Sequence, residues 1–229
     1  MIRQPAVAGQ FYPGNEQALR RELQQLIPEV SPKQQVLGVI SPHAGYIYSG
    51  STAGKLLAGI TIPRAVIILG PNHHGIGSLA ALSPEDAWQT PLGTVPIEKR
   101  LARLIQQQIP AVQEDAVAHL REHSLEVQVP FLQYLRPDVT IVPICLAFGD
   151  YAGCEIVGNG IAAAVKEFDE PVLILASSDM THYESAERAK QKDSLALECA
   201  LALDPQGLVQ VCRSNRITMC GVIPAAVML

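Results

Sequence analysis

The stretch AVIILGPNHHG, residues 65–75, decides the fold class of this chain. Its first six residues form an apolar run without polar alternation, which is typical of a β-strand that is covered on both faces. The run ends directly in a polar cluster that contains His73 and His74. A buried strand that ends in histidines is therefore the first structural prediction.

The same arrangement occurs at two other places in the chain. The run VLGVIS at 36–41 leads into His43, and the run PVLILASS at 171–178 leads into Asp179 and His182. Both runs again lack the polar alternation of a half-exposed strand. Three buried strands, each followed by groups that can bind a metal or transfer a proton, are therefore expected.

Helical patterns alternate with these strands. Residues 16–27 carry Leu19, Leu23 and Leu26 on one stripe, with Asn15 as the expected N-cap. Further helices are expected at 49–58, 96–109, 124–135, 155–168 and 186–203, and a fourth strand at 141–149. Pro130 should bend or shorten the helix in which it lies. The alternation predicts an α/β chain with a layered α/β/α architecture and a mostly parallel or mixed central sheet. A single domain over residues 1–229 is expected.

Composition excludes two classes of function. The formal net charge is −5, and no cluster of Lys and Arg offers a surface for nucleic acid. The apolar runs are too short to cross a bilayer.

The cysteines indicate a reducing compartment. Five cysteines without a CxxC pair, in a chain whose first residues lack a secretion signal, are interpreted as reduced thiols. A cytoplasmic protein is expected.

The three strand ends predict a metal site. Ligands of open α/β sheets bind beyond the carboxyl ends of the strands, so His43, His73, His74, His182 and Asp179 should converge if the strands are parallel neighbours. Imidazole is the commonest protein ligand for transition metals. A single histidine after a strand is more often an ordinary loop residue, but three such loops weaken that alternative.

Two further groups have a less specific pattern. His123 lies between Glu122 and Ser124 before the 124–135 helix and can face the crevice, although ordinary helix capping explains the segment equally well. Cys220 is a free cysteine near the end of the sequence, and from the residues alone it does not stand out from Cys145 or Cys212.

Seven motifs together resemble the Memo family, whose bacterial and archaeal members are often called AmmeMemoRadiSam system protein B. They are AVAGQFYPG at 6–14, SPHAGYIYSG at 41–50, ILGPNHHG at 68–75, WQTPLGTV at 88–95, EHSLEVQVPFLQ at 122–133, SSDMTHY at 177–183 and MCG at 219–221. The family is similar to the class III extradiol dioxygenases of the LigB type. Because family members usually continue beyond the CG motif, the resemblance implies that the C-terminal part of the family fold is missing.

The resemblance implies a ligand set and a cofactor. It places the metal on His43, His73 and Cys220, with Fe(II) or Cu as the expected ion and Zn as a possible one. A thiolate in place of a carboxylate shifts a site towards softer metals.

The resemblance also implies which residues handle protons in the pocket. Asp179 and His182 match the SSDxxH motif, and His123 matches the EHS motif. These three are the expected catalytic residues.

Two functions remain open at this stage, and a third is weaker. The first is an iron- or copper-dependent redox enzyme, related to the extradiol dioxygenases, that acts on an unknown small molecule. The second is a non-catalytic metal- or peptide-binding accessory protein that works beside AMMECR-type and radical-SAM partners. The third is a hydrolase that uses metal-bound water.

Overall fold

The strand predicted at 65–70 is β3, which lies in the middle of a six-stranded sheet with the order β2-β9-β3-β8-β4-β7. This computed structural model describes all 229 residues. The strands of the sheet are β2 (Gly38–Ser41), β3 (Ala65–Pro71), β4 (Ala80–Leu82), β7 (Gln113–Glu114), β8 (Thr140–Leu146) and β9 (Val172–Ser177). The first four strands in the order are parallel, whereas β4 runs antiparallel to β8. The sheet is therefore mixed.

Alternate residues of β3 point to opposite faces, as a strand requires. Ile67 and Leu69 pack in one hydrophobic core, and Val66 and Ile68 pack in the other. All seven residues of β3 are buried. The apolar run thus fills two cores at once, which is why it shows no polar alternation.

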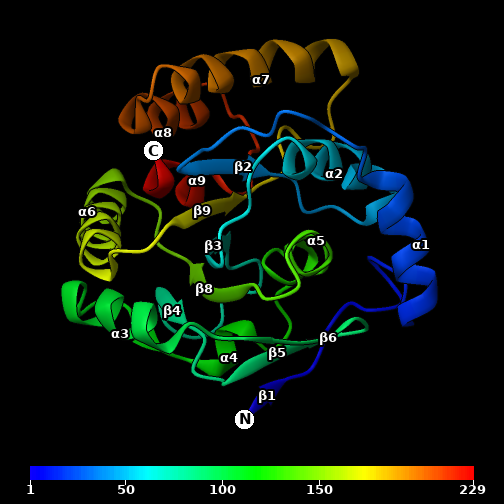
Figure 1. Cartoon of the computed structure of the whole chain (residues 1–229). Coiled ribbons are helices and arrows are strands. Elements are labelled where there is room, and N and C mark those ends of the chain that lie inside the picture. Colours follow the sequence, from blue (N-terminus) through cyan, green and yellow to red (C-terminus); the bar gives the residue numbers. More distant parts are fainter.

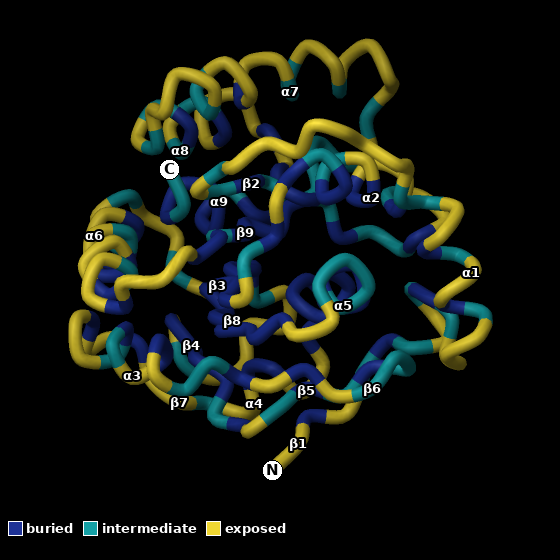
Figure 2. The backbone as a smooth tube through the Cα atoms, in the orientation of Figure 1, coloured by how far each residue is buried: buried dark blue, intermediate teal, exposed yellow.

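Helices cover both faces of the sheet (Figure 1). One core contains residues of α1 (Glu16–Leu26), α2 (Ser51–Ala58) and α5 (Val129–Leu135), and the opposite core contains residues of α3 (Lys99–Gln108), α6 (Tyr151–Phe168) and α9 (Val222–Met228). Figure 2 shows the central strands buried and the outer surfaces of α6 and α7 (Ala186–Leu201) exposed. The layered α/β/α fold expected from the sequence is confirmed.

Smaller elements complete the chain. A second sheet has the order β1-β5-β6 and is formed by β1 (Ile2–Arg3), β5 (Ala87–Thr90) and β6 (Gly93–Pro96). The remaining elements are α4 (Ala116–His119), α8 (Pro205–Ser214), a single π-helical turn η1 (Tyr46–Gly50) and a 3-10 turn η2 (Glu126–Gln128). No helix combines the length and the apolar character that a membrane span needs.

Three predicted helices differ from the structure at their starts by more than two residues. The helix expected at 155–168 begins earlier, at Tyr151, where Asp150 is its N-cap. The helix expected at 96–109 begins only at Lys99, because Pro96 ends a strand. The helix expected at 124–135 begins at Val129 after a 3-10 turn. Pro130 lies in its first turn, where the missing N–H costs nothing, so it starts this helix and does not bend it.

Candidate metal centre

Three neighbouring parallel strands carry the candidate ligands to one edge of the sheet. The carboxyl ends of β2, β9 and β3 lie side by side, and Ser41 at the end of β2 pairs with Ser177 at the end of β9. His43, Asp179 and His73 follow these strand ends by two residues each. The convergence expected of them is therefore a direct result of strand order.

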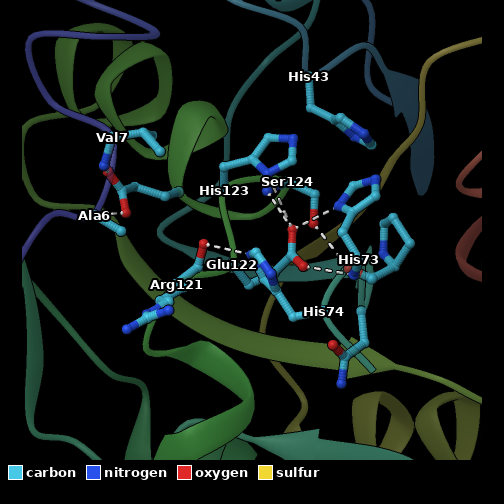
Figure 3. A network of polar contacts seen from close by, with 12 residues as sticks. Ala6, Val7, His43, His73, His74, Arg121, Glu122, His123 and Ser124 are labelled. Carbon is cyan, nitrogen blue, oxygen red and sulfur yellow. Dashed lines mark hydrogen bonds and ion pairs between the residues drawn. The ribbon is translucent and has the colours of Figure 1, made fainter. Parts of the chain in front are cut away.

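Three imidazoles meet at this edge (Figure 3). One ring nitrogen from each of His43, His73 and His123 lies within 4.8 Å of the other two. The rings of His73 and His123 are stacked with centroids 4.6 Å apart, and the His43 ring stands edge-on to both. His43 is buried, whereas the side chains of His73 and His123 are 29% and 21% exposed. This group could hold a metal ion and is open on one side.

Cys220 adds a sulfur to the group. Its Sγ lies 3.1 Å from Nε2 of His43 and accepts a hydrogen bond from the main-chain N–H of Asp179 at 3.2 Å. Gly221 makes this approach possible: a Cβ at that position would lie 2.3 Å from the main-chain oxygen of Ser177. The Cys-Gly pair therefore lets the chain before α9 come into contact with the end of β9.

Glu122 orients His73. Its fully buried carboxylate accepts hydrogen bonds from Nδ1 of His73 at 2.8 Å, from the main-chain N–H of His73 at 2.7 Å and from that of Ser124 at 2.8 Å. Since a carboxylate that faces these donors accepts from them, Nδ1 of His73 carries a hydrogen and Nε2 is left to face the centre. Burial raises the pKa of Glu122, but the bonds from His73 and Ser124 outweigh burial and lower it to about 2.

The thiol and the imidazoles have shifted protonation equilibria. Burial raises the pKa of Cys220, but hydrogen bonds with His43 and His73 outweigh burial and lower it to about 6. Burial lowers the pKa of His73, but hydrogen bonds with Cys220 and Glu122 reverse the effect and raise it to about 10. Burial lowers the pKa of His123 to about 4. At neutral pH these shifts favour the thiolate of Cys220, the charged imidazole of His73 and the neutral imidazole of His123.

Asp179 lies at the centre but faces the main chain. Its Oδ1 accepts hydrogen bonds from the main-chain N–H groups of His43 at 2.8 Å and Ala44 at 3.2 Å, and Oδ2 is 4.0 Å from Nε2 of His43. Asp179 thus fixes the loop that carries His43. Its expected role in proton transfer stays a prediction.

His74 does not join the group, whereas His182 contacts the segment that carries Cys220. His74 is exposed, and its Nε2 contacts the main-chain oxygen of Arg121 at 3.1 Å. Nδ1 of His182 contacts the main-chain oxygen of Thr218 at 2.8 Å, two residues before Cys220. His182 therefore holds the Cys220 segment, and its expected catalytic role stays a prediction. For His74 the expected convergence was wrong, because adjacent residues of a loop point in different directions.

A buried ion pair between Arg3 and Glu126 holds the N-terminal segment next to the centre. Nη1 of Arg3 donates to Oε2 of Glu126 at 2.7 Å, and both side chains are almost fully buried. Glu126 also accepts from the main-chain N–H groups of Ala6 and Val7 and from the Tyr12 hydroxyl. Arg3 donates further to the main-chain oxygens of His119 and Glu122.

Sequence reasoning missed several of these partners. It did not assign roles to Glu122 or Arg3, and it interpreted Ser124 as a helix cap. The structure corrects this interpretation: the Ser124 hydroxyl donates to the main-chain oxygen of Pro71, and its N–H donates to Glu122. The signal that could have identified Glu122 is an acidic residue directly before a histidine in the sequence.

The donor set fits a transition metal. Three imidazoles and a thiol are borderline-to-soft ligands, which suit Fe, Cu and Zn, whereas Mg and Ca prefer oxygen. Buried partners hold Nδ1 of His43 and Nδ1 of His73, as outer-shell partners of metal ligands do.

Comparison with known proteins agrees with the motifs. The family model described as Memo-like protein matches residues 3–229. A MEMO1 family protein of Methanopyrus kandleri is 40% identical over 99% of this chain and 85% of its own length. MEMO1 family proteins of Pyrobaculum arsenaticum and Thermotoga petrophila are 41% and 42% identical over 100% and 96% of this chain, and over 85% of their own lengths. The chain belongs to the Memo-like protein family.

Proposed function

We propose that this chain binds iron or copper through His43, His73 and Cys220 and that the bound metal takes part in redox chemistry on a small molecule. The observation that carries the proposal is the meeting of three ring nitrogens within 4.8 Å, with the Cys220 sulfur 3.1 Å from one of them. A site of this size, from four separate segments of chain, is what a transition metal requires.

The sulfur ligand is present in the form that suits metal binding, whereas His73 must first release the hydrogen on its Nε2. Metals bind the thiolate of cysteine and the neutral nitrogen of histidine. Cys220 has a pKa lowered to about 6 by its imidazole neighbours, so the thiolate is available at neutral pH. A bound iron or copper ion would supply one-electron redox chemistry.

His123 is proposed as the residue that accepts a proton beside such a metal, because its neutral ring lies at the open side of the centre. Burial lowers its pKa to about 4, so it is neutral at pH 7. It stacks on His73 and is partly exposed, and a substrate that enters the open side would meet it. His182 and Asp179 are proposed to assist by holding the Cys220 and His43 loops.

The thiol in the site also favours a second function, that of a non-catalytic metal-binding accessory protein. Thiolate sulfur binds copper and zinc tightly, and it oxidises readily when oxygen chemistry occurs next to it. A protein that only stores or presents metal avoids that damage. AMMECR-type and radical-SAM proteins, or a peptide, are its proposed partners.

Elemental analysis of protein purified without chelators tests the site. We expect wild-type protein to contain about one iron or copper per chain and His73→Ala to lose it. His74→Ala is the matched control, since His74 is the adjacent histidine and contacts only a main-chain oxygen of Arg121. Equal metal content in His73→Ala and wild type would overturn the assignment.

Oxygen consumption by the metal-loaded protein separates the two functions. A redox enzyme consumes oxygen with an oxidisable substrate such as a catechol, and His123→Ala lowers the rate while metal content stays constant. A storage or accessory protein binds the metal at fixed stoichiometry and consumes no oxygen above the rate of the free ion.

A further inference from the structure

The hydroxyl of Ser177, at the last position of β9, contacts three groups. Its Oγ lies 2.6 Å from the main-chain oxygen of Ser124, 2.9 Å from Nε2 of Gln128 and 3.0 Å from Nδ1 of His43. Ser177 is fully buried. A hydroxyl has a single hydrogen and two lone pairs, so the roles in these three contacts are limited.

The hydrogen of Ser177 belongs to the contact with Ser124. A main-chain oxygen can only accept, and 2.6 Å is the shortest of the three distances. Both lone pairs of Oγ are then left for the other contacts. Ser177 must accept a hydrogen from Gln128 and a hydrogen from His43.

The amide of Gln128 has its nitrogen at Ser177. That nitrogen lies 2.8 Å from the main-chain oxygen of Pro42, which can only accept. The amide oxygen accepts from the hydroxyl of Ser41 at 2.8 Å. A flipped amide would set two acceptors against each other at Pro42, so the orientation is determined by the partners.

These contacts determine the protonation of the His43 ring. Nδ1 must carry a hydrogen, because Ser177 has none left to donate. In the neutral ring, Nε2 is then unprotonated, and this is the nitrogen that lies 3.1 Å from the Cys220 sulfur. We propose that Ser177 and Gln128 are positioning residues that hold His43 in the Nδ1–H tautomer and thereby present Nε2 as a metal ligand.

This inference deepens the proposed function and rests on it for its biological meaning. It also explains the polar ends of two apolar strands. Ser41 and Ser177 are cross-strand partners at the ends of β2 and β9, and Gln128 bridges both hydroxyls. A different partner holds a hydrogen on Nδ1 of His73, since Glu122 accepts from that nitrogen. Both buried partner sets leave the Nε2 atoms facing the centre.

Nuclear magnetic resonance of metal-free protein with isotope-labelled histidine tests the tautomer directly. Cys220→Ala is used so that no thiol shares a proton with Nε2, and spectra are taken at about pH 9, well above the ordinary histidine pKa of about 6.5. The His43 signals are those lost in His43→Gln. We expect His43 to be Nδ1–H, and Ser177→Ala in the same background to populate the Nε2–H form.

Zinc affinity of the otherwise wild-type chain gives a second readout. We expect Ser177→Ala to bind zinc about 10- to 100-fold more weakly, and Ser177→Thr, which keeps the hydroxyl, to restore most of the affinity. Ser83→Ala is the matched control, because Ser83 is a buried serine whose hydroxyl contacts only Glu85 and Trp88. We expect it to bind zinc as wild type does.

The outcomes separate this inference from the proposed function. A His43 ring that is Nε2–H while Ser177 is intact overturns the inference, whether or not metal binds and whether or not the Ser177 variants fold. A ring held as Nδ1–H in a chain that binds no metal supports the inference and removes the proposed function.

Discussion

At the scale of single residues, Glu122 does the most to organise the centre. Its two oxygens accept three hydrogen bonds, and two of the donors belong to His73. A buried carboxylate without such donors would not stay ionised. The loop and the charge therefore stabilise each other: the charge holds the loop, and the loop keeps the carboxylate ionised.

Glu122→Gln should weaken metal binding by about 10- to 100-fold and destabilise the fold by about 1–3 kcal/mol. The amide has the same shape, but its NH₂ group replaces one oxygen that now accepts from an N–H. A donor then faces a donor at His73 or at Ser124. Zinc competition with a chelator and urea unfolding measure the two effects.

Glu29→Gln is the control for this change, because Glu29 is exposed and its loss of charge is the same. It should leave both quantities unchanged. If Glu122→Gln bound zinc with the affinity of wild type, the Glu122 carboxylate would only hold the main chain at His73 and Ser124 and would not support metal binding.

At the scale of elements, the N-terminal segment is held by one buried ion pair. Arg3 lies in β1, and Glu126 lies in η2, three residues after His123. The Arg3 guanidinium also stacks over the Trp88 ring at 4.2 Å from its centroid. Phe11, in the segment that Glu126 fastens, packs against the His123 ring with centroids 4.7 Å apart. The N-terminal segment held by the Arg3–Glu126 ion pair therefore packs directly against the His123 ring of the centre.

Arg3→Ala should destabilise the protein by about 3–5 kcal/mol, because it leaves the Glu126 carboxylate buried without its charge partner. Arg20→Ala is the matched control: Arg20 pairs with Glu16 at 2.9 Å, but on the exposed surface of α1. It should cost less than about 1 kcal/mol. Urea unfolding of both variants measures the difference. If both lost the same free energy of unfolding, burial would not make the Arg3–Glu126 pair more important than the exposed pair.

At the scale of the whole molecule, the strongest patterns were the most predictable. The apolar strands at 65–70 and 171–178 and the helices at 16–27 and 155–168 were predicted because long periodic or unbroken patterns have only one stable solution. The short strands β4 to β7 and the helices α8 and α9 were not predicted. Strands of two to four residues carry too few positions for a period, and tertiary pairing determines them.

Only those site residues that directly follow neighbouring parallel strands were predictable from the sequence. Consecutive strand ends place His43, His73 and Asp179 together, and any parallel sheet with this order would do the same. Side-chain direction within a loop is not encoded in spacing, which is why His74, next to His73, contacts the main-chain oxygen of Arg121 instead of the centre. Cys220 could be assigned from the family resemblance and not from its own surroundings in the sequence.

Buried histidines also make the stability of the whole molecule depend on pH. His119 is fully buried, its Nε2 contacts the main-chain oxygen of Ala81 at 3.0 Å, and Nδ1 has no hydrogen-bond partner in the protein. Burial, followed by the charge of Arg3, lowers the pKa of His119 to about 4. Burial lowers the pKa of His123 in the same direction.

Stability of the metal-free protein should fall between about pH 6.5 and pH 4. In this window the unfolded chain, with histidine pKa values of about 6.5, binds protons that the folded His119 does not, so acid favours unfolding. The raised pKa of His73 and the lowered pKa of Cys220 act mainly above this window, with opposite signs. His119→Gln removes one titrating group and should lose about 2 kcal/mol less than wild type between pH 6.5 and 4.5. Urea unfolding at a series of pH values measures both slopes. If the free energy of unfolding fell equally with pH in the two proteins, His119 would take up its proton in the folded chain. Its burial would then not make the fold sensitive to acid.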